Sequence, residues 1–174
     1  MLAVGVLGLL MLGVSLGDRR AGLISWLTVG LLVIVGAAVL GRAGPPTAFS
    51  GAFIDDAFAR FTKILAIGGS ALSIVVARDF VTREGMDRFE FPILIALSTL
   101  GMMMLTSAND LIAFYLALEL MSLALYVVAA FQRDSIRSTE AGLKYFVLGA
   151  LSSGLVLYGA SLVYGFSGTT SFPA

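Results

Sequence analysis

The sequence contains no cysteine and no histidine among its 174 residues. Without thiols and imidazoles it can form no disulfide bond, iron–sulfur cluster, or zinc or haem site that uses these ligands. Charged residues make up only 13% of the chain, and Lys plus Arg equal Asp plus Glu at 11 each. We therefore expect no nucleic-acid partner and no polybasic lipid-binding patch. Chemistry in this chain must use carboxylates, Lys, Tyr, Ser, Thr and water.

Apolar residues dominate the composition instead. They make up 59% of the sequence, and the mean hydropathy is +0.99, which is typical of membrane proteins with several spans. The pattern predicts an all-α transmembrane bundle forming a single domain over 1–174. Its six apolar runs cover about 2–17, 21–40, 61–78, 91–108, 111–131 and 141–164. The first run would reach only about 24 Å against a hydrocarbon core of roughly 30 Å, so we expect residues to be missing upstream.

Two connections between the runs are informative. Asn109 and Asp110 leave almost no loop between the fourth and fifth runs, so these helices should be antiparallel neighbours. The longest connection, 41–60, contains Gly44-Pro45-Pro46, which should end the second helix, and then alternates phenylalanines with Asp55, Asp56 and Arg60. We interpret it as a loop anchored at the membrane surface, with partner binding as the weaker alternative and capping as the expected role of its acids.

Basic residues are unevenly divided between the two ends of such a bundle, and this bias sets orientation. The N-terminus is therefore predicted outside the cytoplasm. The loops predicted to be cytoplasmic carry Arg19, Arg20, Arg78, Arg83, Arg88, Arg133 and Arg137, and the opposite side carries Arg42, Arg60 and Lys63.

Glu119 lies near the middle of the fifth apolar run, where a carboxylate opposes insertion by roughly 3 kcal/mol. An ionisable residue at this depth is a functional candidate. Tyr115, Ser122 and Tyr126 fall within about 60° of it on a helix. These hydroxyls could hold water and line a proton relay around the acid. The alternative is that Glu119 only hydrogen-bonds a neighbouring helix to fix packing.

Lys144 is the one basic residue near a span interior that could act on Glu119 within this chain. Burial without a partner favours a protonated acid, whereas a nearby ammonium favours the carboxylate, so a moving cation would switch the proton. Alternatively, Lys144 extends its ammonium to the membrane interface.

Small residues at helical spacing indicate close helix packing. In the sixth run they form Gly149-x-x-x-Ser153 and Ala150-x-x-x-Gly154, and in the third run they form Gly68-Gly69.

Three segments together resemble a known family. They read SANDL at 107–111, YLALELMSLALY at 115–126 and EAGLKYFVLGA at 140–150, with a weaker match in FIDDAFARF at 53–61. The chain closely resembles the subunit N family of the bacterial proton-pumping NADH:quinone oxidoreductase, respiratory complex I. These subunits belong to the antiporter-like membrane proteins, which also include multisubunit sodium/proton antiporters.

The resemblance implies that Glu119 and Lys144 belong to a buried charge array that relays protons. It also implies that other membrane subunits of complex I are partners and that the chain binds no cofactor, while the whole complex uses NADH and quinone. Family members have about fourteen helices in inverted repeats. The chain would then be an N-terminal fragment that lacks the lysine of the seventh helix and cannot complete a proton path alone. A sodium/proton antiporter subunit and a purely structural helix bundle remain as alternatives.

Overall fold

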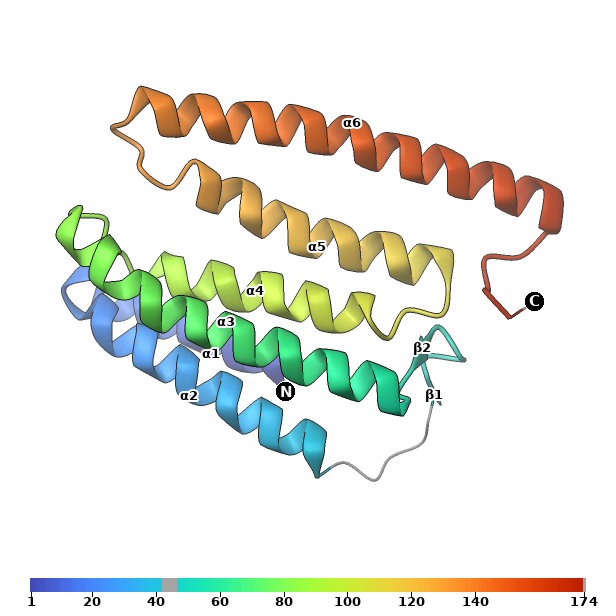
Figure 1. Cartoon of the computed structure of the whole chain (residues 1–174), viewed down its shortest axis with the longest axis horizontal. Helices are drawn as coiled ribbons and strands as arrows, with labels where there is room; N and C mark the ends of the chain where they lie inside the picture. Colours follow the sequence, from blue (N-terminus) through green and yellow to red (C-terminus); the bar gives the residue numbers. More distant parts are fainter. Residues whose placement is uncertain (42–46, 174) are drawn as a thin grey trace.

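The structure is a computed structural model that describes residues 1–41 and 47–173. Within these ranges six α-helices run up and down beside one another (Figure 1). A turn of 3-10 helix, Asp18–Arg20, joins the first two helices, and the short strands β1 (Thr47–Ala48) and β2 (Phe53–Ile54) form an antiparallel hairpin. The helices are α1 (Leu2–Leu16), α2 (Ala21–Leu40), α3 (Ala57–Arg83), α4 (Glu90–Leu105), α5 (Leu111–Ala129) and α6 (Ile136–Ser167).

The all-α fold class is confirmed. Over the described residues, α2, α3, α5 and α6 are long and apolar enough to cross a membrane, whereas α1 and α4 are apolar but shorter. Helices α3 and α6 extend beyond the apolar runs that predicted them, and each begins directly after a residue that caps it. Helix α3 begins after Asp56, whose Oδ1 accepts a hydrogen bond from Ala59 N at 2.7 Å. Helix α6 begins after Ser135, whose Oγ accepts from Ser138 N at 3.4 Å.

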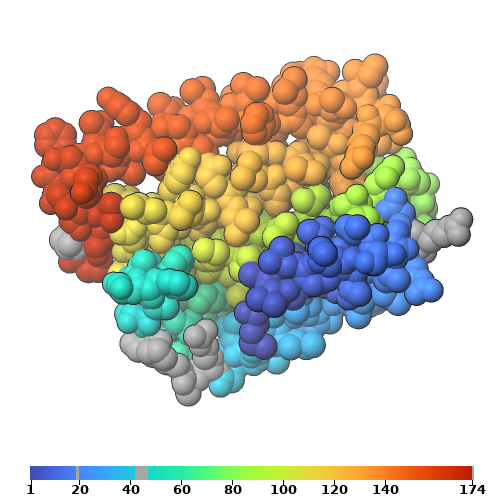
Figure 2. Space-filling view, turned by 180° about the vertical axis from the view of Figure 1, so that it is seen from behind, coloured from blue at the N-terminus to red at the C-terminus, as the bar shows by residue number. Residues whose placement is uncertain are grey.

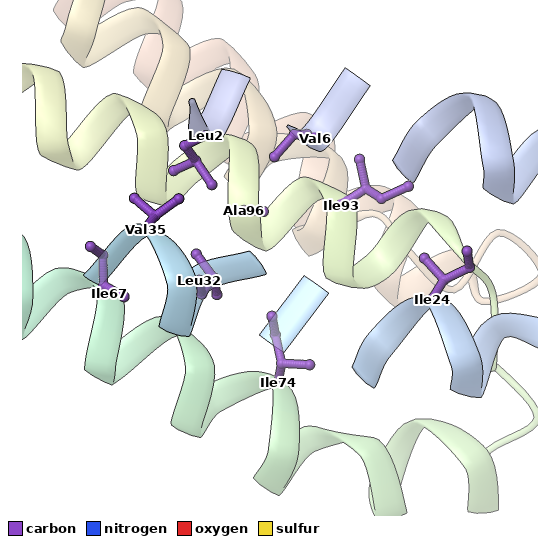
Figure 3. Close-up of a cluster of buried hydrophobic side chains, with 9 residues drawn as sticks. All are labelled: Leu2, Val6, Ile24, Leu32, Val35, Ile67, Ile74, Ile93 and Ala96. Carbon is purple, nitrogen blue, oxygen red and sulfur yellow. The ribbon is translucent and has the colours of Figure 1, made fainter. Parts of the chain in front are cut away.

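The apolar core lies among the first four helices (Figure 3). Helix α5 packs on α4, and α6 forms the outer layer beyond α5 (Figure 1). The core is thus separate from the α5–α6 layer that carries Glu119. Its buried members are Leu2, Val6, Ile24, Leu32, Val35, Ile67, Ile74, Ile93 and Ala96.

The three arginine-rich connections lie at one end of the bundle. Asp18, between α1 and α2, forms an ion pair with Arg88, before α4, at 3.3 Å. The connection between α3 and α4 also lines a shallow pocket together with Gln132 and Arg133 of the connection between α5 and α6. We call this the arginine end.

At the opposite end, two segments hold the short α4–α5 connection at 107–110. The hairpin contributes Ile54, whose N–H donates to Ser107 O at 2.8 Å, and Ala52, whose carbonyl accepts from Asn109 N at 2.8 Å. On the other side the chain after α6 returns, and Thr170 Oγ1 donates to Asp110 Oδ2 at 2.5 Å. The expected loop over 41–60 is therefore partly a hairpin docked on this connection, while Arg42 and Gly44-Pro45-Pro46 lie outside the described residues.

Close helix approach is confirmed at Gly149, where a side chain would collide with the Tyr126 hydroxyl. It is wrong for Gly68, Gly69 and Gly154, because a Cβ added at each would meet nothing within 4 Å. These glycines lie on faces of α3 and α6 that no neighbouring helix covers. Openings separate α6 from α5 along part of their length in the space-filling view (Figure 2).

Candidate functional site

Glu119 lies near the middle of α5, and its side chain is half-buried. Its Oε1 atom is shielded from solvent and has no hydrogen-bond partner among the described residues. Only three other side-chain atoms in the described ranges share this condition: Glu90 Oε2, Ser98 Oγ and Ser107 Oγ. A buried polar atom without a protein partner is rare and calls for a water, an ion or a functional role.

The helical phase of α5 explains which way Glu119 faces. The buried alanines Ala113, Ala117 and Ala124 form one stripe that packs into the bundle. Because residues advance by about 100°, Glu119 lies about 160° from Ala117. Its side chain is therefore on the side of α5 turned away from that packed stripe.

The contacts of Tyr126 show that α6 covers the side of α5 on which Glu119 lies. Its ring is only 8% exposed and packs edge-on against Tyr145 and Phe146 of α6, at centroid distances of 4.7 and 5.7 Å. Its hydroxyl lies against Gly149 of the same helix. Glu119 is within about 20° of Tyr126 around α5 and about 10 Å away along it, so it faces the same α5–α6 layer.

Helix α6 presents its own narrow stripe to α5. Gly142 and Ser153 are its only residues classed as buried in the described range, and Gly149 lies on the same face. Since α5 and α6 are antiparallel, Ser153 is one turn beyond Gly149 and thus level with Ser122 (Figure 1). The half-buried hydroxyls of Tyr115 and Ser122, together with buried Ser153, surround the level of Glu119.

Lys144 is not brought to Glu119. Its side chain is 71% exposed, and its Nζ pairs with Glu140 Oε1 at 2.5 Å within α6. Lys144 lies about 160° around the helix from Gly142, on the face away from α5. Because Lys144 lies on the side of α6 that faces away from α5, it forms no ion pair with Glu119 among the described residues, although the two residues belong to adjacent helices.

A cavity of about 550 Å³ opens between α4, α5 and α6 near the arginine end. Its walls are mostly apolar, with Leu10 of α1 completing one side. The polar side chains that line it are Glu90, Tyr126, Arg133 and Thr139.

Two acids outside the spans are held by clear partners. Lys63 Nζ donates to Asp55 Oδ1 at 2.7 Å and Arg60 Nε to Oδ2 at 3.2 Å, so these cations hold the pKa of Asp55 below 3.8. The Thr170 hydroxyl and the first N–H groups of α5 likewise lower the pKa of Asp110. The ion pairs of Asp55 differ from the solvated or capping role expected for it, and the sequence predicted no role for Asp110.

The sequence analysis missed Glu90. It precedes the fourth apolar run by one residue, so it reads as a boundary charge, yet α4 begins with it. A usable signal was its position next to Phe91 and Pro92, because proline is favoured in the first turn of a helix and places Glu90 inside that turn.

The arrangement suits proton binding and release at a carboxyl group among hydroxyls. Within residues 1–41 and 47–173, no group of three His, Cys, Asp or Glu side chains could hold a metal ion. Each hydroxyl can both donate and accept a hydrogen bond, which lets protein groups and water form a continuous series.

Comparisons with known proteins agree with this picture. Residues 108–174 match the family model described as NADH:quinone oxidoreductase/Mrp antiporter, TM. The chain is 58% identical over 172 residues to NADH-quinone oxidoreductase subunit N of Beijerinckia indica and 57% identical over 175 residues to that of Rhodospirillum rubrum. These matches cover 98% and 99% of this chain but 36% of each relative, so the chain spans about a third of their length.

The fold matches as well. A chain of the structure described as respiratory complex I from Thermus thermophilus with bound Aureothin superposes with a TM-score of 0.83 at 34% identity. The match covers 99% of this chain and 38% of that one. Together with its apolar helices, these matches make the chain a multi-pass membrane protein. In sequence and fold it corresponds, along nearly its whole length, to about a third of an NADH-quinone oxidoreductase subunit N of the antiporter-like membrane family.

Proposed function

We propose that this chain forms part of a proton-translocating membrane subunit of NADH:quinone oxidoreductase, with Glu119 as its protonatable centre. In this proposal, electron transfer from NADH to quinone elsewhere in the assembly drives proton uptake and release at Glu119. The chain contributes a half-channel and no redox centre. It binds no cofactor, and NADH and quinone are used by the whole assembly.

The observation that carries the proposal is the buried, unpartnered Oε1 of Glu119 in the middle of a helix long enough to span a membrane. Ionising a carboxyl group shielded from water costs free energy unless a charge or water compensates it. The protonation of such a group responds strongly to charges that move nearby. A purely structural role, in which Glu119 fixes helix packing, is less well supported, because such a residue would use its oxygens in hydrogen bonds to the adjacent helix.

The hydroxyl groups of the same face would carry protons to and from Glu119. Tyr115 and Ser122 lie within about one helical turn of it, and Tyr126 lies about two turns away toward the arginine end. We propose that water bridges these groups and completes the path between their hydroxyls and Glu119.

Lys144 is proposed as a coupling cation that acts with Glu140 rather than as a direct partner of Glu119. Its ammonium is exposed on the face of α6 away from α5. The relatives are about three times longer than this chain, so a further part of such a subunit would have room to cover that face.

We propose that the chain resides in a bacterial inner membrane with its N-terminus in the periplasm. The arginine end would then face the cytoplasm, in keeping with the bias of basic residues toward that side. Its partners would be the lipid bilayer and the other membrane subunits of complex I.

Replacing Glu119 tests the proposal. The variant Glu119→Gln keeps the shape of the side chain but cannot exchange a proton. It should strongly lower NADH-driven proton translocation in membranes that contain the assembled complex, while the amount of subunit stays normal. Glu84→Gln is the matched control, because Glu84 is an exposed acid at the end of α3.

Normal translocation by Glu119→Gln at normal subunit content would remove Glu119 from the mechanism. A sodium/proton antiporter subunit predicts a different result, in which the variant alters proton movement driven by a sodium gradient instead of by NADH. The 50–58% identity to relatives named subunit N favours the oxidoreductase.

A further inference from the structure

Glu90 is a second acid with a carboxyl oxygen hidden from water. It lies in the first turn of α4, is half-buried, and its Oε2 has no hydrogen-bond partner among the described residues. No ion pair to Glu90 is formed in the part of the chain that the structure describes. Like Glu119, Glu90 therefore has one shielded carboxyl oxygen without a hydrogen-bond partner among the described residues, but it lies nearer the arginine end.

The cavity of about 550 Å³ connects Glu90 with the polar face of α5. Both Glu90 and Tyr126 line it, and Thr139 of α6 lines it as well. A space of this size with several polar groups in its wall can hold water molecules. Oε2 itself is shielded from this space in the structure, so a rotation of the Glu90 carboxyl group would bring it to a water held in the cavity.

Few charged groups line this cavity in the part of the chain that the structure describes. There Arg133, after α5, is the only cation in the lining, and Tyr126 is the only titratable side chain besides Glu90. Arg133 is exposed, so it can remain hydrated while its positive charge acts at the mouth of the cavity.

The helix register gives the spacing. Phe91 of α4 packs against Phe131, with ring centroids 5.5 Å apart, so the start of α4 is level with the end of α5. Tyr126 is then about 8 Å from that level along the bundle, and Glu119 about 10 Å further on. About two waters would bridge the first interval and about three, or two together with the Ser122 hydroxyl, the second, since each O–O hydrogen bond adds about 2.8 Å.

We propose that Glu90 is a second proton-carrying acid, which takes up protons at the arginine end and passes them through cavity water and Tyr126 toward Glu119. In each transfer one O–H bond breaks and one O–H bond forms, and no electron moves. Glu90 regains its proton from water at the mouth beside Arg133. This inference deepens the proposed function and rests on it.

The test uses the assembled complex in native membranes. It compares Glu90→Gln and Glu90→Asp with Glu119→Gln and the control Glu84→Gln. We expect Glu90→Gln to slow proton translocation by roughly tenfold or more, as for loss of a positioned acid, and Glu90→Asp to retain most of it. Subunit content is measured in every variant.

A second measurement does not depend on translocation. Dicyclohexylcarbodiimide, which modifies protonated carboxyl groups in apolar surroundings, is added to wild-type membranes, and the labelled peptides are identified by mass spectrometry. Labelling at Glu90 but not at Glu84 supports the inference. An unlabelled Glu90 under conditions that label Glu119 overturns it, even if the Glu90→Gln protein fails to accumulate.

The translocation results separate the two proposals. Wild-type translocation by Glu90→Gln together with loss in Glu119→Gln would overturn the role of Glu90 and leave the proposed function standing. Wild-type translocation by both variants would overturn the proposed function itself. A low rate in Glu90→Gln with recovery in Glu90→Asp supports the role of Glu90, because a merely structural glutamate would not be rescued by a shorter acid.

Discussion

At Glu119 a single carboxyl group combines shielding from water with a lack of any protein partner for one oxygen. Neither condition alone implies proton transfer, because buried acids commonly form ion pairs and exposed acids commonly have no partner. Their combination on a helix face lined by Tyr115, Ser122 and Tyr126 leaves water as the natural partner. That is the local chemistry on which the proposed function rests.

Asp55 allows a pH prediction outside the spans. Lys63 and Arg60 lower its folded-state pKa, so its contribution to stability is complete above the ordinary value of 3.8 and is lost as the pH falls through the lower folded value. Hydrogen exchange of the amides at 55–60 should stay slow down to about pH 4 and rise only below it. The variant Asp55→Asn should lower the free energy of opening at these amides by on the order of 1 kcal/mol, so that they exchange faster at pH 7. It should also lose this pH dependence.

An onset of fast exchange well above pH 4 in the wild type would contradict this account of Asp55. Asp79→Asn is a suitable control, because Asp79 is exposed near the end of α3 and forms no ion pair among the described residues.

Lys144 gives a prediction that separates stability from function. Its ion pair with Glu140 is an exposed pair one turn apart, and such pairs contribute about 0.5 kcal/mol or less. Lys144→Met should therefore leave the amount and thermal stability of the subunit almost unchanged, while NADH-driven proton translocation falls. Arg137→Met, on an exposed residue of the same helix, should change neither.

If Lys144→Met translocates protons at the wild-type rate, Lys144 is not a coupling cation. Its ammonium then serves only the exposed pair with Glu140, as the interfacial interpretation of the sequence holds.

Among the elements, the α4–α5 pair depends on a glycine. A Cβ at Gly101 would lie 2.5 Å from Met121 N and 2.8 Å from Met121 Cα, and backbone atoms cannot rotate away. Gly101→Ala should force the two helices apart and lower the stability of the subunit by about 1–3 kcal/mol. The loss is measurable as a lower Tm of the complex in detergent.

Gly69→Ala is the matched control for this prediction. It lies within α3, and a Cβ there would meet nothing within 4 Å, so the change should be neutral or stabilising by up to about 1 kcal/mol. Equal Tm values for Gly101→Ala and the wild type would show that α4 and α5 do not approach as closely as described.

Apolar runs predicted the number and order of the helices, because the need to satisfy backbone hydrogen bonds in lipid leaves few alternatives. The starts of α3 and α6 were not predicted in this way, since Asp56 and Ser135 act as caps only once the helix is formed. The hairpin at 47–54 also could not be predicted, because it is held by Ser107 and Asn109, more than fifty residues away.

The sequence predicted only part of the candidate site, because helical periodicity fixes the residues that share a face but not the face that a neighbouring helix covers. The face shared by Glu119 and Tyr126 follows from helical periodicity alone. The separation of Lys144 from Glu119 depends on which face α6 turns toward α5, and this is set by contacts at Gly142 and Gly149 that periodicity does not reveal. Glu90 was missed because its shielding comes from tertiary packing around the cavity.

In the whole molecule, α5 packs closely on α4 beside the core of the first four helices, and α6 forms the outer layer beyond α5. Helices α5 and α6 carry the hydroxyls and Glu119, and openings remain between them (Figure 2). Space for water between α5 and α6 suits a path for protons. The arginine end lies at one end of the bundle, and the α4–α5 connection at 107–110, held by the hairpin and by the chain after α6, lies at the other.

Infrared difference spectroscopy of the assembled complex tests the central claim most directly, because it detects the C=O stretch of a protonated carboxyl group. Spectra are recorded between the resting complex and the complex turning over NADH, for the wild type, Glu119→Gln and Glu84→Gln. The account predicts a carboxyl band that changes with turnover in the wild type and the control and is absent from Glu119→Gln. The same band persisting unchanged in Glu119→Gln would contradict it.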